Sequence, residues 1–205
     1  MRKALIFTGG KAPEYARYSH EVDSSDIILA ADSGYDIALR DSVDVDVLLG
    51  DMDSITHKPC ANCKVIRFPR DKDYTDTELA ISYVHDHIQY GEIVVIGGGE
   101  GHLHHTLSML NLFRQRTHPV RWYTQKECVY FVETSLDLYF STLQQNISVL
   151  GLYDAESLVK STGLFWDLRS FPICSGHHSV SNRNVDNQVS IELLSGKGVL
   201  VSVSY

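Results

Sequence analysis

The chain runs Val45-Asp46-Val47-Leu48-Leu49-Gly50-Asp51-Met52-Asp53-Ser54 through the segment from which its architecture is most easily recognised. A short run rich in valine and leucine, as in 45–49, is typical of a strand in a parallel sheet that is covered on both faces. Gly50 favours a sharp turn after the strand, and two carboxylates follow at once. In open α/β sheets, ligands bind beyond the carboxyl ends of the strands. The segment therefore predicts a parallel sheet with acidic side chains at its ligand-binding edge.

Short apolar runs of the same kind recur on both sides of this segment, at 4–7, 27–30, 65–68 and 93–96. Helical patterns lie between several of them. The clearest begins at Thr75, where Thr75 and Glu78 form a capping-box pattern ahead of regularly spaced apolar residues. A second runs from about 105 to 113. This alternation predicts an α/β domain over 1–124 with a mostly parallel, Rossmann-like open sheet.

The pattern changes near Gln125. Short strand-like runs follow at 128–132, 136–140, 147–150 and 199–203, and glycine, asparagine and serine separate many of them. No convincing helical pattern intervenes, which is typical of an antiparallel sandwich or barrel. We therefore expect a second, all-β domain over 125–205, built as a sandwich of the jelly-roll kind.

Composition excludes some classes of function. The net charge of −8 over 205 residues, without clustered lysine or arginine, argues against a non-specific nucleic-acid binder. No apolar run approaches the ~18 residues of a membrane span. The start, Met1-Arg2-Lys3, runs directly into a strand-like segment and does not have the form of a signal peptide. We therefore expect a cytoplasmic protein without a membrane segment.

Acidic residues gather in the first domain, at Asp32, at Asp51 and Asp53, and in Asp71-Lys72-Asp73-Tyr74-Thr75-Asp76. Carboxylates gathered in this way repel one another unless a cation lies between them, and hard oxygen ligands suit Mg²⁺. A lysine among the acids suits a phosphate oxygen. The small residues Ser33 and Gly34 would let a nucleotide approach the backbone. An Asx-turn at Asp51 and helix capping at Asp76 are the purely structural alternatives.

A glycine-rich loop, Gly97-Gly98-Gly99-Glu100-Gly101-His102-Leu103-His104-His105, follows the strand-like run that ends at Ile96. Its spacing fits neither a P-loop nor a complete G-x-G-x-x-G motif. A glycine loop at a helix start can still bind an anion through free N–H groups. Glycines that only serve a tight turn, or histidines that hold a transition metal, are the alternatives.

Two segments of the second domain also contain candidate binding residues, Thr162-Gly163-Leu164-Phe165-Trp166-Asp167-Leu168 and Ser179-Val180-Ser181-Asn182. The indole of Trp166 could stack on an aromatic, cationic ring, although a lone tryptophan is more often part of a core. Ser181 and Asn182 could orient such a ligand, and a turn explains them equally well.

Six blocks in consistent order resemble the thiamine pyrophosphokinase family over nearly the whole chain. They begin at Ala31, Gly50, Asp71, Gly97, Thr162 and Ser179. The resemblance implies an amino-terminal α/β domain that binds ATP and Mg²⁺, a carboxy-terminal β-sandwich, and a homodimer with active sites between subunits. It also implies transfer of pyrophosphate from ATP to the hydroxyl of thiamine, with release of AMP.

By position, the resemblance implies roles for three sets of residues. The catalytic set is Asp51, Asp53, Asp73 and Asp76, of which Asp51, Asp53 and Asp76 would ligate metal. The ATP and phosphate region would contain Asp32, Ser33, Lys72, Thr75, Gly97, Gly98, His102 and His104. The thiamine pocket would contain Trp166, Ser181 and Asn182.

One block departs from the family pattern. The family's glycine loop usually ends in Gly-Arg-x-Asp, and this chain has Gly101-His102-Leu103-His104. Histidine lacks the permanent charge and the bidentate fork of arginine, and the second replacement removes an anion. Two alternatives to thiamine phosphorylation therefore stay open: a pyrophosphokinase for another heterocyclic alcohol such as a hydroxymethyl pterin, and a weakened sensor of thiamine or nucleotide.

Overall fold

The structure, a computed structural model, describes residues 2–205, which divide into a compact unit ending at Gln125 and another spanning Lys126–Tyr205. The elements of the first unit are β1 (Arg2–Thr8), the 3₁₀ turn η1 (Tyr15–Arg17), α1 (Ser19–Asp23), β2 (Ile27–Ala31), α2 (Gly34–Arg40), β3 (Val47–Gly50), β4 (Lys64–Arg67), α3 (Asp76–His87), β5 (Tyr90–Ile96), α4 (Leu103–Leu112) and β6 (Arg121–Tyr123).

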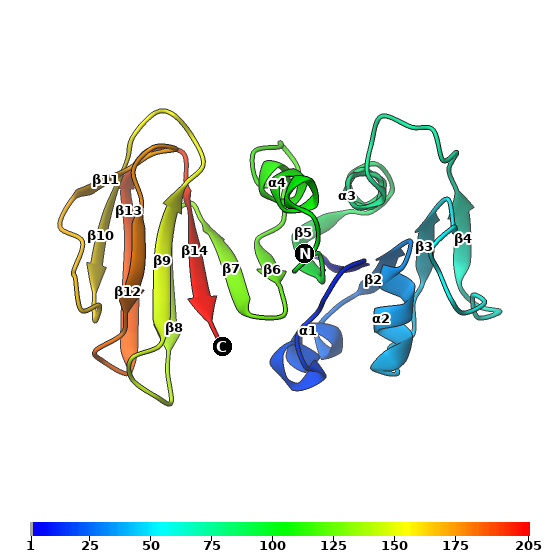
Figure 1. Cartoon of the computed structure of the whole chain (residues 1–205), viewed down its shortest axis with the longest axis horizontal. Coiled ribbons are helices and arrows are strands. Elements are labelled where there is room, and N and C mark those ends of the chain that lie inside the picture. Colours follow the sequence, from blue (N-terminus) through cyan, green and yellow to red (C-terminus); the bar gives the residue numbers. More distant parts are fainter. Residues whose placement is uncertain (1) are drawn as a thin grey trace. The chain divides into compact units, whose positions relative to one another are not determined.

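The strands of this unit pair in the order β6-β5-β1-β2-β3-β4, and every pairing is parallel. Figure 1 shows α3 and α4 on one side of the strands and α1 and α2 on the other. Residues 4–7 of β1 are completely buried between these layers. The parallel pairing and the helices on both faces confirm the predicted Rossmann-like open sheet. The buried apolar run in β1 is what a strand covered on both faces requires.

The chain order of the strands creates a switch point beside β1. From β1 the chain adds β2, β3 and β4 in one direction, and then returns to place β5 on the other side of β1. The loops that follow β1 and β5 therefore leave the sheet side by side and diverge. Open α/β sheets bind their ligands in the crevice at such a point.

The predicted capping box at the start of α3 is confirmed. The Thr75 hydroxyl accepts a hydrogen bond from the backbone N–H of Glu78 at 3.2 Å, and the Glu78 carboxylate accepts one from the backbone N–H of Thr75 at 2.8 Å. These two bonds satisfy amides that the first helical turn leaves free. The start of α3, and so the position of Asp76, is set by local sequence.

The second unit is a sandwich of two antiparallel sheets. Its strands are β7 (Glu127–Val132), β8 (Ser135–Tyr139), β9 (Asn146–Gly151), β10 (Ser157–Thr162), β11 (Phe171–Ile173), β12 (Ser179–Arg183), β13 (Gln188–Ser195) and β14 (Val199–Ser204). One sheet contains β12-β9-β14-β7 and the other β11-β10-β13-β8. Apolar side chains from both sheets, including Val149, Val159 and Val201, form one buried core. The predicted sandwich is therefore confirmed.

Within residues 2–205, no helix is long and apolar enough to cross a membrane.

The junction of β2 and α2 depends on a close backbone approach at Gly34. A Cβ at this position would lie 2.3 Å from the carbonyl oxygen of Phe7, at the end of β1. Because a backbone atom cannot move aside cheaply, we expect Gly34→Ala to lower the free energy of unfolding by about 1–3 kcal/mol or more. Urea denaturation would measure this change.

Gly176→Ala is the matched control, since a Cβ there would meet no heavy atom within 4 Å. We expect it to change the free energy of unfolding by no more than about 0.5 kcal/mol. Equal stability of the two variants would show that the approach of Gly34 to β1 does not constrain the fold.

Candidate active site

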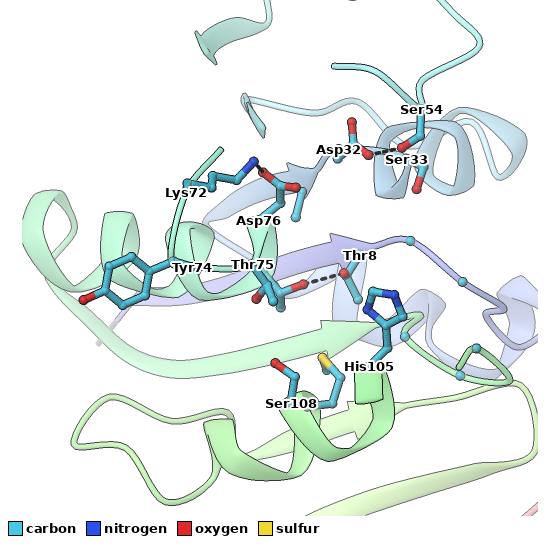
Figure 2. Close-up of a pocket in the computed structure, with 18 of the residues that line it drawn as sticks. Thr8, Asp32, Ser33, Ser54, Lys72, Tyr74, Thr75, Asp76, His105 and Ser108 are labelled. Atoms are coloured by element: carbon cyan, nitrogen blue, oxygen red, sulfur yellow. Dashed lines mark hydrogen bonds and ion pairs between the residues drawn. The ribbon is translucent and has the colours of Figure 1, made fainter. Parts of the chain in front are cut away.

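A pocket of about 460 Å³ lies at the switch point of the first unit. Its wall includes the loop after β1 (Gly9 and Gly10) and the loop after β5 (Gly98 and Gly99), together with residues from the starts of α3 and α4. Figure 2 shows Lys72 and Asp76 facing each other, while His105 and Ser108 enter from α4. The pocket is thus built from loops at the carboxyl ends of parallel strands.

Three carboxylates gather at the edge of this pocket. One oxygen each from Asp32, Asp51 and Asp53 lies within 4.8 Å of the other two. Oδ2 of Asp32 accepts a hydrogen bond from the Ser54 hydroxyl, whereas the buried Oδ1 has no hydrogen-bond partner among residues 2–205. An unpaired buried carboxylate oxygen is costly unless a cation meets it. This donor set of hard oxygens fits a divalent cation such as Mg²⁺.

The backbone is unusual where it brings these carboxylates together. Asp32 and Met52 both have positive φ angles, 46° and 65°. Gly50 has φ 142°, and a Cβ there would lie 3.1 Å from both the Cβ of Asp32 and Oδ1 of Asp76. Such left-handed residues cost energy and concentrate at functional sites. A side chain at position 50 would separate the acids that the site gathers.

Lys72 and Asp76 form the next part of the cluster. Nζ of Lys72 lies 3.2 Å from Oδ1 of Asp76 and 3.7 Å from Oδ2 of Asp51, and the lysine side chain is only 14% exposed. Burial raises the pKa of Asp76, Lys72 opposes this, and the charges of Asp32 and Asp51 raise it further. The net upward shift in the pKa of Asp76 therefore comes mainly from burial, with the neighbouring carboxylates adding to it.

The pKa of Asp51 is shifted in the opposite direction. The backbone N–H of Asp53 donates to Oδ1 of Asp51 at 3.2 Å, and this bond, with the charge of Lys72, lowers the pKa of Asp51. A hydrogen bond to the ionised form favours that form. Asp51 is therefore ionised at neutral pH and available as an anionic ligand.

Only some of the residues predicted for the ATP and phosphate region line the pocket. Asp32, Ser33, Lys72, Thr75 and Gly98, together with the predicted metal ligand Asp76, line the pocket. Gly97 lies behind the wall, where its carbonyl accepts a hydrogen bond from the Trp122 indole at 2.6 Å. This hydrogen bond holds the backbone of the glycine loop against β6.

His102, His104 and Asp73 are exposed and are not among the residues that line the pocket. The rings of His102 and His104 stack on each other, with centroids 5.4 Å apart. His105, the next residue of the loop, lines the pocket instead. His102 is the N-cap residue of α4, so His104 and His105 stand in the first turn, where successive side chains point in different directions around the helix.

Several residues of the pocket wall were not predicted: Thr8, Gly9, Gly10, Ser54, Arg70, Tyr74, His105, Ser108 and Met109. Gly9 and Gly10 could have been found, since they follow the first strand of a parallel sheet as directly as Asp51 follows β3. Ser108 and Met109 lie inside α4 and have no distinguishing sequence signal.

The candidate residues of the second unit form a separate arrangement around Asn182. This side chain is completely buried; its Oδ1 accepts from the backbone N–H of Trp166 at 3.1 Å, and its Nδ2 donates to the Trp166 carbonyl at 2.7 Å. The Trp166 side chain itself is 55% exposed, and the exposed Ser181 has a positive φ of 58°. Asn182 therefore holds the turn that presents Trp166 from a completely buried position.

Comparisons with known proteins identify relatives of this chain. Residues 18–123, just over half of the chain, match the family model described as "Thiamin pyrophosphokinase, catalytic domain". A protein of Caenorhabditis elegans named thiamin pyrophosphokinase 1 is 27% identical over 159 residues, which cover 71% of this chain and 65% of that protein. The chain thus spans slightly less than two thirds of this relative.

Solved structures with the same fold cover the whole chain. A thiamin pyrophosphokinase family protein from Enterococcus faecalis has a TM-score of 0.80 at 18% identity, covering 100% of this chain and 99% of that one. Thiamine pyrophosphokinase from Bacillus subtilis has a TM-score of 0.78 at 19% identity, with 99% and 98% covered. At this level of identity the likeness is one of fold.

The buried amide of Asn182 generates a test in the second unit. Asn182→Ala leaves the N–H and the carbonyl of Trp166 without their partner, and each unsatisfied group costs about 1–3 kcal/mol. We therefore expect the free energy of unfolding to fall by at least that amount in urea denaturation. Asn146→Ala, at an exposed position of β9, is the control and should be nearly neutral. Equal effects would contradict the role assigned to Asn182.

Proposed function

The chain belongs to the thiamin pyrophosphokinase family, and we propose that it transfers pyrophosphate from ATP to the hydroxyl of thiamine, giving thiamine diphosphate and AMP. One observation carries the proposal: three carboxylates and a shielded lysine adjoin a pocket at the switch point of a parallel sheet. The name of the C. elegans relative supports the same activity. Such crevices commonly bind nucleotides together with a metal ion.

We propose that Mg²⁺ accompanies ATP, and that Asp32, Asp51 and Asp53 hold it. Asp76 was predicted as a ligand on the basis of the family pattern. Asp32 is favoured as the third ligand because one of its oxygens lies within 4.8 Å of oxygens of Asp51 and Asp53, whereas Oδ1 of Asp76 is already 3.2 Å from Nζ of Lys72. When bound, Mg²⁺ neutralises charge on phosphate oxygens and helps to align the reacting groups.

The residues around the metal site have complementary tasks in this proposal. Lys72 is shielded from solvent and can exchange its carboxylate partners for a phosphate oxygen, where a localised positive charge is useful. Backbone N–H groups of the loops at Gly9 and Gly98 can donate to further phosphate oxygens. Asp76, whose pKa is raised, is the candidate to accept the proton of the acceptor hydroxyl.

We also propose that Trp166 stacks on thiamine, with Ser181 nearby. In this proposal the protein is a cytoplasmic homodimer, and its active sites lie between the two subunits. The exposure of the Trp166 ring supports the stacking role, since an exposed indole fixed by a buried amide is available to a planar cation. Asn182 acts in this proposal by positioning Trp166.

The departures at His102 and His104 left two other functions open, a pyrophosphokinase for a pterin-type acceptor and a sensor of thiamine or nucleotide. Both side chains are exposed and lie outside the residues that line the pocket. The pocket wall of this chain therefore contains neither replacement, which supports thiamine as the acceptor.

The acceptor is tested by incubating the purified protein with ATP, Mg²⁺ and either thiamine or a hydroxymethyl pterin, and measuring AMP. We expect AMP and thiamine diphosphate in the reaction that contains thiamine, and no AMP in the reaction that contains the pterin. AMP release only with the pterin would replace thiamine as the acceptor. Binding of thiamine in calorimetry without AMP at any Mg²⁺ concentration would indicate a sensor.

The metal site is tested with Asp53→Asn. Asp53 is 45% exposed and contributes little to packing, so we expect thermal stability to be kept. Loss of even an outer-shell partner of a metal ligand costs roughly 10- to 100-fold in activity, and we expect this variant to lose at least that much turnover. Asp44→Asn, an exposed carboxylate that precedes β3, is the control and should retain full activity. Full activity of Asp53→Asn would remove Asp53 from the metal site.

A further inference from the structure

The loop after β3 carries Asp51 and Asp53 and has no regular structure of its own. Residues 51–60, all within the described chain, form neither helix nor strand. Without a ladder of backbone hydrogen bonds, the position of such a loop depends on the side chains that hold it. The contacts that fix this loop therefore decide whether its carboxylates can act together.

Asp36, in the first turn of α2, holds the loop through both carboxylate oxygens. Its Oδ2 accepts a hydrogen bond from the backbone N–H of Thr56 at 2.9 Å, and its Oδ1 lies 2.8 Å from Nδ1 of His57. The Asp36 side chain is 22% exposed and that of His57 is 64% exposed. Hydrogen bonds to a carboxylate are the stronger kind, and two on one group restrict both distance and orientation.

The charge state of Asp36 agrees with this anchoring role. Burial acts to raise the pKa of Asp36, but the hydrogen bonds from His57 and from Thr56 outweigh it and lower the pKa below its usual value. The group is therefore ionised at neutral pH, which is the form that accepts both bonds.

A second anchor lies two residues earlier in the loop. The Ser54 hydroxyl donates to Oδ2 of Asp32, which lies between β2 and the N-cap residue of α2. Asp32 and Asp36 are four residues apart along the β2–α2 segment, and together they hold the loop at Ser54 and at Thr56. The anchors lie on the carboxyl side of Asp53, while the end of β3 holds the loop before Asp51.

We propose that Asp36 is a positioning residue of the metal site, which keeps the carboxylates of Asp51 and Asp53 within reach of Asp32 although it touches neither metal nor substrate. The physical reason is electrostatic. The three carboxylates repel one another, and a free loop would relax by moving Asp51 and Asp53 away from Asp32. A cation would then have to restore the arrangement at the expense of its own binding energy.

This inference rests on the proposed metal-dependent function, and its test measures metal binding directly. The full chain is titrated with Mn²⁺, a paramagnetic probe for a carboxylate site, and free Mn²⁺ is followed by electron paramagnetic resonance. The variants are Asp36→Ala and Asp36→Asn, with Asp44→Asn as the carboxylate control. Circular dichroism and thermal melting report whether each variant is folded.

We expect Asp36→Ala to weaken Mn²⁺ binding about 10- to 100-fold, as loss of an outer-shell partner does. Asp36→Asn keeps the shape and one acceptor for the Thr56 N–H, so its loss should be smaller, and Asp44→Asn should bind as the native chain does. If Asp36→Ala is not folded, Asp36→Asn decides, with any measurable weakening supporting the proposal.

Native Mn²⁺ affinity in a folded Asp36 variant would overturn the inference, even if its melting temperature falls, because that result describes a merely structural residue. Absence of Mn²⁺ binding by the native chain would overturn it too. Mn²⁺ binding that depends on Asp36, in a protein that forms no AMP with thiamine, would refute the proposed activity and leave the positioning role intact.

Discussion

Repulsion between carboxylates is the constraint around which the amino-terminal unit is organised. Oxygens of Asp32, Asp51 and Asp53 lie within 4.8 Å of one another, and burial together with the charges of Asp32 and Asp51 raises the pKa of the neighbouring Asp76. Gly50 has no side chain to push Asp32 and Asp76 apart, and the little-exposed Lys72 lies beside Asp51 and Asp76. A chain selected for stability alone would not gather these groups. The arrangement is one that a cation and a polyphosphate would complete, which connects the electrostatics of the site to the proposed reaction.

The topology of the sheet explains why the cluster has a pocket beside it. The chain places β5 on the opposite side of β1 from β2, so the loops after β1 and β5 separate at the carboxyl edge. Glycines in both loops let the backbone approach the space between them, and α3 and α4 supply the polar side chains of its wall. Asp36 adds a further connection, because its hydrogen bond with Thr56 ties the loop that carries Asp51 and Asp53 to helix α2.

Regular elements with strong local signals were predictable from the sequence, and elements that depend on distant partners were not. The apolar runs of β1 and β5 and the capping box of α3 are local features, and the structure has them where they were predicted. The strands β10 and β13 escaped prediction because one face of each is buried only by the opposite sheet, which a single segment does not reveal. Among candidate site residues, acidic motifs pointed to the correct edge of the sheet, but the grouping of Asp32 with Asp51 and Asp53 required strand order.

The order of residues along the chain was sufficient to indicate the α/β unit, the β-sandwich and a family resemblance, because strand periodicity, helix caps and short acidic motifs are local properties. Tertiary packing decided that His105 lines the pocket while His102 and His104 do not, since it determines which face of α4 meets the pocket. Packing likewise used the amide of Asn182 to hold Trp166 and paired Asp36 with Thr56. These contacts join residues far apart in sequence, and their geometry exists only after the chain has folded.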